Sequence, residues 1–225
     1  MSAPLSTTGP AQSRTSLAYN LAGIAVLVLL MAVGLAYLVD RAGRSSAPVQ
    51  PALGDGDIVQ QTIAGRELDI PAAWFRYGEQ IKSGFASQID LRFLLQLEPG
   101  MAPLPVGVTL LPRSRARASS ALLDAVYLHQ FEDGMKGGVP GLVGKSLVAR
   151  DGYAGETVWY DPLSPVPFVA KCASAVTPGR PDQCLRTIHL QSGLAAVLSF
   201  DATALPSWRQ FDQELALWLG QIGAL

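Results

Sequence analysis

The sequence is poor in the residue types from which most catalytic and metal sites are built. It contains two cysteines and two histidines among 225 residues, and charged residues make up 16% of the chain. It has no C-x-x-C, H-E-x-x-H or G-x-S-x-G motif, so thioredoxin-like chemistry, zinc binding and serine hydrolysis lack their local signals. The histidines, His129 and His189, are far apart in sequence and do not make a zinc site. We therefore predict no catalytic residues and no metal site.

A nucleotide-binding loop is missing as well. The segment Gly138–Ser146 ends like a phosphate-binding loop, but Val139 stands where the motif requires glycine. Pro140 also removes a backbone donor from this loop. The net charge of −1 gives no reason to expect nucleic acid as a partner. We expect neither a cofactor nor a nucleic-acid ligand.

What the sequence does contain is one long hydrophobic run, Leu21–Val39, without a charged side chain. As a helix it would be about as long as the hydrocarbon core of a bilayer is thick. A cleaved signal peptide has a shorter apolar region, and the exit at Tyr37–Arg41 is a poor cleavage site. A helix buried in a soluble core would normally show a polar face, which this run lacks. The run therefore favours an uncleaved single-pass anchor that contacts the lipid bilayer.

The orientation of this anchor does not follow from its flanking charges. Arg14 precedes the run, whereas Arg41 and Arg44 follow it and are offset by Asp40, so the positive-inside rule is nearly balanced. Arginine far outnumbers lysine, and alanine, leucine, glycine and proline are abundant, which is typical of a GC-rich bacterial genome. We expect a bacterial inner-membrane protein with its C-terminal domain in the periplasm.

The composition divides the chain into four parts. Residues 1–20 are mostly small and polar and are expected to form a disordered tail. Residues 21–39 form the predicted transmembrane helix, and residues 40–57 are rich in serine, proline and glycine and are expected to form a linker. Residues 58–225 are then numerous enough for one exported domain with a hydrophobic core.

Within this domain the clearest strand covers 87–97, where apolar and polar residues alternate as they do on a half-buried sheet. Residues 58–63 and 67–70 are expected to form a hairpin around Ala64-Gly65. Further strands are predicted at 106–111, 146–150, 157–160, 167–172, 184–190 and 194–200.

Three segments carry a helical pattern. A short helix opened by Pro71 is predicted over 71–82, and an amphipathic helix over 119–132. The C-terminal helix is expected to begin at Ser207, with Gln210 completing a capping box, and to pack an apolar stripe on the sheet. The expected fold is therefore α+β, a mostly antiparallel sheet with two or three packed helices, preceded by one transmembrane helix.

The only cysteines, Cys172 and Cys184, each lie at the edge of a predicted strand, and a short turn-like segment separates them. Facing strands bring Cα atoms close enough for a disulfide. Two free thiols or a redox-active pair are the alternatives, but an exported domain favours a structural disulfide. The periplasmic assignment depends on this pair.

Two surface clusters are candidates for binding. Aromatic and acidic side chains gather around one predicted turn, where they either line a sugar or peptide groove or form a half-buried hairpin face. The residues of this aromatic-acidic turn are Tyr153, Glu156, Trp159 and Tyr160. The second cluster, Arg113, Arg115 and Arg117, either meets lipid phosphates or an acidic partner or is simply solvated.

Several segments together resemble a group of uncharacterised single-pass membrane proteins of alphaproteobacteria with a periplasmic domain. These segments are LDIPAAWFRYGEQ at 68–80, FVAKC at 168–172, CLRTIHL at 184–190 and LPSWRQFDQELALWL at 205–219. The resemblance implies a periplasmic address and no known activity.

The sequence thus favours a membrane-tethered periplasmic accessory or scaffold protein that is not an enzyme and that works beside a membrane protein complex. The alternative is a periplasmic domain that binds a small molecule or glycan, or acts on one, through the aromatic-acidic turn around Trp159.

Overall fold

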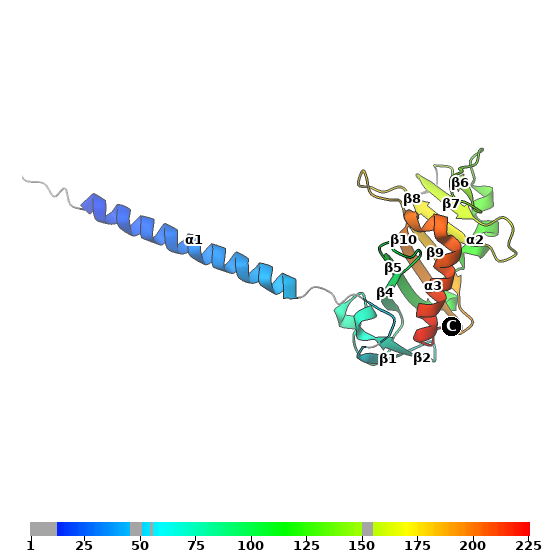
Figure 1. The fold of residues 1–225 in the computed structure, drawn as a ribbon, viewed down its shortest axis with the longest axis horizontal. Coiled ribbons are helices and arrows are strands. Elements are labelled where there is room, and N and C mark those ends of the chain that lie inside the picture. Colours follow the sequence, from blue (N-terminus) through cyan, green and yellow to red (C-terminus); the bar gives the residue numbers. More distant parts are fainter. Residues whose placement is uncertain (1–12, 46–50, 55, 150–154) are drawn as a thin grey trace, which may run out of the picture. The chain divides into compact units, whose positions relative to one another are not determined.

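The computed structural model describes residues 13–45, 51–54, 56–149 and 155–225 of the chain. The chain divides into two compact units, Met1–Val49 and Gln50–Leu225. Figure 1 gives the course of the chain and the labels of its elements.

The first unit contains a single described element, α1 (Ser13–Ser45). Its segment Leu21–Val39 is long and apolar enough to cross a membrane, and none of it is buried inside the protein. The interpretation of this run as a buried core helix is therefore wrong. Residues 13–20 and 40–45 are also helical, where a tail and a linker were expected, because extending an existing helix adds a hydrogen bond for each residue fixed. Residues 1–12, 46–50 and 55, which complete that tail and linker, lie outside the described residues.

The described part of the second unit is built on two sheets. The larger sheet is antiparallel, with the order β4-β5-β10-β9-β8-β7-β6. Its strands are β4 (Ile89–Leu95), β5 (Leu104–Pro112), β6 (Val143–Ser146), β7 (Glu156–Tyr160), β8 (Val169–Ala173), β9 (Gln183–His189) and β10 (Leu194–Asp201). The smaller sheet has the order β2-β1-β3 and contains β1 (Ile58–Ile63), β2 (Arg66–Pro71) and β3 (Gly84–Phe85). With α2 (Ser119–Ala125) and α3 (Trp208–Gln221), these sheets confirm the predicted α+β fold.

The predicted hairpin β1–β2 is confirmed, and its turn explains it. Ala64 and Gly65 connect the strands, and both have positive φ angles, 51° and 77°. Two consecutive positive φ values belong to the turn whose twist matches that of the flanking strands. The register then pairs Ile63 with Arg66.

The main hydrophobic core lies between the large sheet and α3, which crosses the sheet in Figure 1. The alternation predicted for β4 is confirmed, since Ile89, Leu91, Phe93 and Leu95 are all fully buried. On α3, Trp218 packs with its ring centroid 5.0 Å from that of Phe93. The C-terminal helix is therefore part of the core.

A second, smaller core lies on the opposite face of the sheet. Strand β7 alternates between the two cores: Val158 belongs to the small one, whereas Trp159 packs against the main one. Helix α2 supplies Leu123 to the small core, and Val169 comes from β8. The two helices thus cover opposite faces of the same sheet.

Two predicted helices are shorter in the structure. The segment 71–82 forms two 3-10 turns, Ala72–Trp74 and Gly78–Gln80, because Phe75 between them pairs with the edge of the large sheet at Leu91. The helix predicted over 119–132 ends at Ala125 and is followed by a 3-10 turn. There Phe131 bridges to Leu147, so pairing with an exposed sheet edge overrides the helical pattern in both segments.

Two further local predictions are wrong. The strand expected at 146–150 instead covers Val143–Ser146, because Gly144, expected in a glycine-rich loop, pairs with Trp159. Ser207 stands at the N-cap position of α3 as predicted, but the predicted capping hydrogen bond is not formed, since its hydroxyl donates to the Glu98 carboxylate at 2.9 Å.

A buried carboxylate joins β4 to the 3-10 turn beside it. Asp90 is 8% exposed and accepts hydrogen bonds from the Thr109 hydroxyl (2.6 Å) and from the amides of Gln80 and Gln88 (both 2.9 Å). Burial raises the pKa of Asp90, but these hydrogen bonds, with the nearby Arg76 charge, together hold it below its ordinary value of 3.8. The folded state therefore favours the ionised carboxylate.

We expect Asp90→Asn to lower the free energy of unfolding at neutral pH by about 1–3 kcal/mol, because a buried, hydrogen-bonded charge is lost. A lowered pKa stabilises the fold above the pKa of the unfolded state, and this contribution disappears as the pH falls through the folded-state pKa. The stability gap between native protein and variant should therefore narrow below about pH 4. Urea denaturation over a pH series measures it. Asp69→Asn, at an exposed position of β2, should show no such gap. A gap that does not change with pH would contradict this role of Asp90.

Candidate functional site

The two cysteines lie directly opposite each other on β8 and β9. Cys172 and Cys184 form a disulfide, with their Cα atoms 3.9 Å apart, and both are buried. The predicted pairing is thus present. It joins the two strands one residue from the end of β8 and one residue from the start of β9, close to the strand edges where the sequence placed it.

The residues of the aromatic-acidic turn do not converge. The Glu156 carboxylate pairs with the Lys171 ammonium at 2.7 Å. The Trp159 ring lies against the backbone of Gly144, where an added Cβ would come within 2.7 Å of the ring.

Tyr160, the next residue along β7, points to the other face of the sheet and stacks on Phe131, with 5.9 Å between the centroids. Tyr153 lies outside the described residues. The described members of this turn therefore do not line a common groove, and their binding role stays a prediction.

A different site arises where the large sheet opens. Strand β9 pairs with β10 along its whole length, but with β8 only from Gln183 to Leu185. Beyond Leu185 the edge of β9 is met by the segment that enters α2. The Thr187 amide donates to the Ser119 hydroxyl, and His189 Nε2 donates to the Ala116 carbonyl, both at 2.8 Å.

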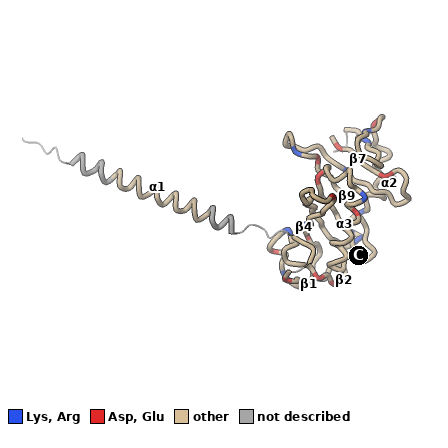
Figure 2. The backbone as a smooth tube through the Cα atoms, viewed as in Figure 1, with Lys and Arg blue, Asp and Glu red and all other residues tan. Residues whose placement is uncertain are grey.

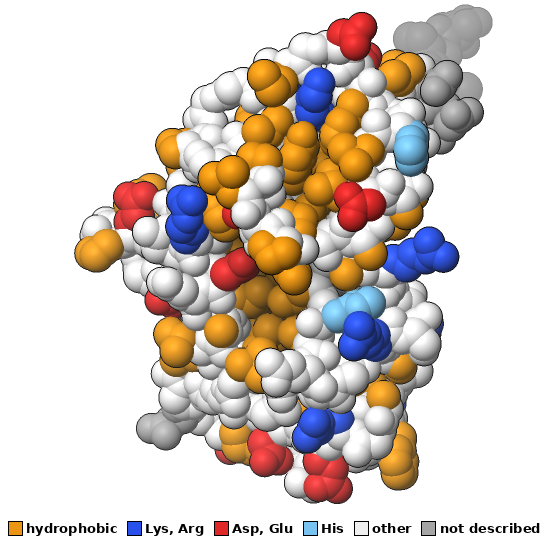
Figure 3. All heavy atoms as spheres, turned by 90° about the vertical axis from the view of Figure 1, so that its right-hand side faces the viewer, with side chains coloured by type: hydrophobic (Ala, Val, Ile, Leu, Met, Phe, Trp, Pro, Cys, Tyr) orange, Lys and Arg blue, Asp and Glu red, His pale blue; other side chains and the backbone are white. Residues whose placement is uncertain are grey.

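A pocket of about 350 Å³ lies at this opening, between β9, the start of α2 and the loop that enters β8. Figure 3 shows a hollow with hydrophobic side chains on its floor and with basic and acidic side chains and a histidine around its rim. The lining combines apolar residues (Ala118, Ala121, Val166, Pro167, Val169, Ile188) with polar ones (Arg113, Ser119, Ser120, Arg186, Thr187, His189). We call it the β8–β9 pocket.

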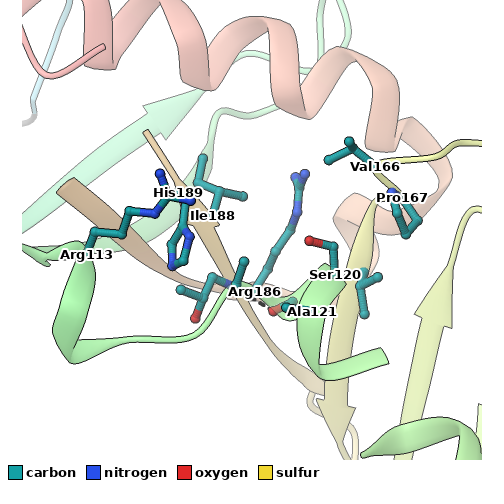
Figure 4. A pocket seen from close by; sticks show the side chains of 12 residues that line it. Arg113, Ser120, Ala121, Val166, Pro167, Arg186, Ile188 and His189 are labelled. Atoms are coloured by element: carbon teal, nitrogen blue, oxygen red, sulfur yellow. Dashed lines mark hydrogen bonds between the residues drawn. The ribbon is translucent and has the colours of Figure 1, made fainter. Parts of the chain in front are cut away.

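The central polar group of the β8–β9 pocket is Arg186. Its side chain rises from β9 towards α3 (Figure 4), and the residue is only 8% exposed. It makes a two-point ion pair with Asp212 of α3, with Nη2 3.0 Å from Oδ2 and Nη1 on Oδ1. Its guanidinium also lies 4.2 Å from the centroid of the Phe168 ring. These contacts hold a buried cation in place.

Arg186 was not predicted from the sequence as a site residue. Because it lies two residues from Cys184 in a strand, it must share a face with that cysteine, and that face was expected to be buried. A charged residue at such a position needs a partner and is a usable signal. Arg113 and His189 were singled out in the sequence, and the structure brings both of them to the β8–β9 pocket.

The lining of the β8–β9 pocket is basic. It contains two arginines and one histidine but no aspartate or glutamate. Among the described residues, no group of three or more histidine, cysteine, aspartate or glutamate side chains is placed to hold a metal ion. The guanidinium groups in this lining are suited to hydrogen-bonding an anionic group.

The fold has a solved counterpart. It is similar to that of an immunity protein of the Stenotrophomonas maltophilia type IV secretion system, with a TM-score of 0.51 and 12% sequence identity. The likeness covers 78% of this chain and 99% of that chain, and it shows a shared fold. No family model and no curated protein matches the sequence. The resemblance to alphaproteobacterial membrane proteins therefore gains no support from these comparisons.

Proposed function

We propose that α1 anchors this chain in a bacterial inner membrane and that Gln50–Leu225 acts in the periplasm as a non-enzymatic accessory protein that binds another envelope protein. The observation that carries the proposal is the combination, in one chain, of an unburied apolar helix and a disulfide-bonded domain. Neither feature alone defines both a membrane and an oxidising compartment.

The physical support comes from what each feature requires. Within α1 the backbone groups are paired internally, so Leu21–Val39 presents only apolar side chains to its surroundings, as a lipid core demands. The Cys172–Cys184 disulfide persists in oxidising compartments such as the periplasm and is rare in the reducing cytosol.

The accessory role is supported by the kind of site that the domain carries. A protein that shares its fold serves as an immunity protein of a secretion system. The β8–β9 pocket offers fixed positive charge and apolar walls. Fixed charge and apolar walls are the features with which a pocket holds and orients a ligand.

Topology reporters test the address. A periplasm-dependent alkaline phosphatase fused to the C-terminus should be active, and a green fluorescent protein fused there should stay dark. The protein should remain in the membrane fraction at full length, and its cysteines should react with alkylating reagents only after reduction. A matched variant, Leu29→Arg with Leu30→Arg, should leave the membrane, because each central arginine costs about 2.5–3.5 kcal/mol there.

A fluorescent C-terminal fusion, a shortened soluble product or freely alkylated thiols would overturn the address. Extraction in mild detergent tests the partner: a second envelope protein should co-purify in stoichiometric amount. Consistent recovery of a lone monomer would overturn the accessory role.

A further inference from the structure

We propose that the β8–β9 pocket binds an acidic side chain of the partner protein, with the carboxylate held by Arg113 and Arg186 and the flanking apolar residues held by the pocket walls. This inference rests on the proposed function, because it names the surface and the chemistry by which the domain would hold a partner. Its first support is the set of Arg186 N–H groups that Asp212 does not use.

Arg186 has more donors than its partner uses. A guanidinium carries five N–H groups, and Asp212 accepts from two of them. Among the described residues no other acceptor bonds to this side chain, although the residue is 8% exposed. A second carboxylate at the pocket would therefore meet donors that are already fixed in direction.

Arg113 supplies the net positive charge of the pocket. The charge of Arg186 is offset by Asp212, whereas Arg113 is exposed and its guanidinium has no hydrogen-bonded acceptor among the residues that the structure describes. Figure 4 shows its side chain reaching from the end of β5 towards His189. The two arginines thus approach the pocket from different elements, and the site keeps a net positive charge.

The apolar residues of the pocket walls indicate that the bound carboxylate belongs to a peptide segment. Pro167 and Ile188 line the pocket, and Val166 at its rim is 77% exposed. On the same loop Leu163 is 91% exposed. Apolar surroundings strengthen the attraction between opposite charges. They also offer contact to apolar neighbours of an acidic residue, which a small inorganic anion cannot use.

The size of the pocket agrees with a short peptide segment. At about 350 Å³ it lies near the lower end of the range of ligand pockets, which runs from about 300 to 1,000 Å³. None of the lining residues is acidic, and the Asp212 carboxylate beside the pocket is already paired with Arg186. The occupant is thus an aspartate or glutamate flanked by apolar residues.

The test uses the full chain in nanodiscs of phosphatidylcholine, a zwitterionic lipid without net charge. The probe is a fluorescent, end-capped peptide Ser-Leu-Glu-Val-Ser, and its control has glutamine in place of glutamate. Binding is followed by fluorescence anisotropy. The acidic peptide should bind at least tenfold more tightly than the glutamine peptide, and Arg113→Gln should weaken it at least tenfold.

Two further variants make the test specific. Arg117→Gln removes the same charge from a neighbouring exposed arginine outside the pocket lining and should leave binding within a factor of two. Val166→Glu adds a negative charge at an exposed rim position and should weaken binding at least tenfold. Unchanged urea midpoints establish that the variants are folded.

Absence of binding to the native protein, or equal weakening by Arg113→Gln and Arg117→Gln, would overturn the proposal. Displacement of the peptide by inorganic phosphate at the concentration at which acetate displaces it would also overturn it, because the site would then select an anion and not a carboxylate. These results do not depend on membrane topology or on co-purification, so failure of this proposal and failure of the proposed function are distinguishable.

Discussion

Replacing Trp218 by alanine is expected to lower the free energy of unfolding by about 3–5 kcal/mol. Trp218 is 2% exposed, and its ring centroid lies 4.6 Å from that of Trp74 and 5.0 Å from that of Phe93. Removing the indole leaves a cavity at the point where α3, β4 and the 3-10 turn around Trp74 meet. A loss of this size approaches the whole stability of many domains, so much of the variant should be unfolded at 37 °C.

Urea denaturation followed by circular dichroism measures this effect. Leu217→Ala is the matched control, since Leu217 is adjacent in α3 but 56% exposed and should cost less than about 0.5 kcal/mol. Trp218→Phe should cost much less than Trp218→Ala, because the indole Nε1 is buried without a hydrogen-bond partner among the described residues. Equal losses for Trp218→Ala and Leu217→Ala would contradict the packing of α3 on the sheet.

Replacing both Cys172 and Cys184 by alanine is expected to lower the free energy of unfolding by about 2–3 kcal/mol. The bond closes a short loop, with a sequence separation of 12 residues, so the chain-entropy estimate lies at the lower end of the range for disulfides. Reduction of the native protein should produce a loss of similar size.

The comparison should be made by urea denaturation with and without reductant. The native protein should become less stable in reductant, whereas the double alanine variant should not respond. A native protein whose urea midpoint is insensitive to complete reduction would contradict a stabilising role of this bond.

The sequence predicted those elements in which the pattern of apolar residues follows from burial of one face of a strand or helix. Alternation placed β4 correctly, and the turn at Ala64-Gly65 located the β1–β2 hairpin. The apolar stripe of α3 identified its buried side, including Trp218. In each case burial of one face agrees with local preference, so a single segment contains enough information.

Prediction from the sequence failed where the conformation of a segment is set by pairing with a strand that is distant in the sequence. Phe75 and Phe131 leave their helical patterns to pair with the edges of the large sheet, at Leu91 and Leu147. Nothing within segments 71–82 or 119–132 reveals that an unpaired edge lies nearby. The β8–β9 pocket escaped prediction for the same reason, because it forms where the segment that enters α2, 68 residues before Thr187, meets the edge of β9 beyond the last residue pair with β8.

The separation of β8 and β9 gives the disulfide a second consequence. The sheet consists of two ladders, β4-β5-β10-β9 and β8-β7-β6, that touch along three residue pairs, with the Cys172–Cys184 bond at the middle pair. At one end the ladders are bonded together, and at the other they diverge around the start of α2 and the pocket. The bond thus ties the two ladders together beside the point from which they spread, so the strands that flank the β8–β9 pocket are covalently joined at its closed end.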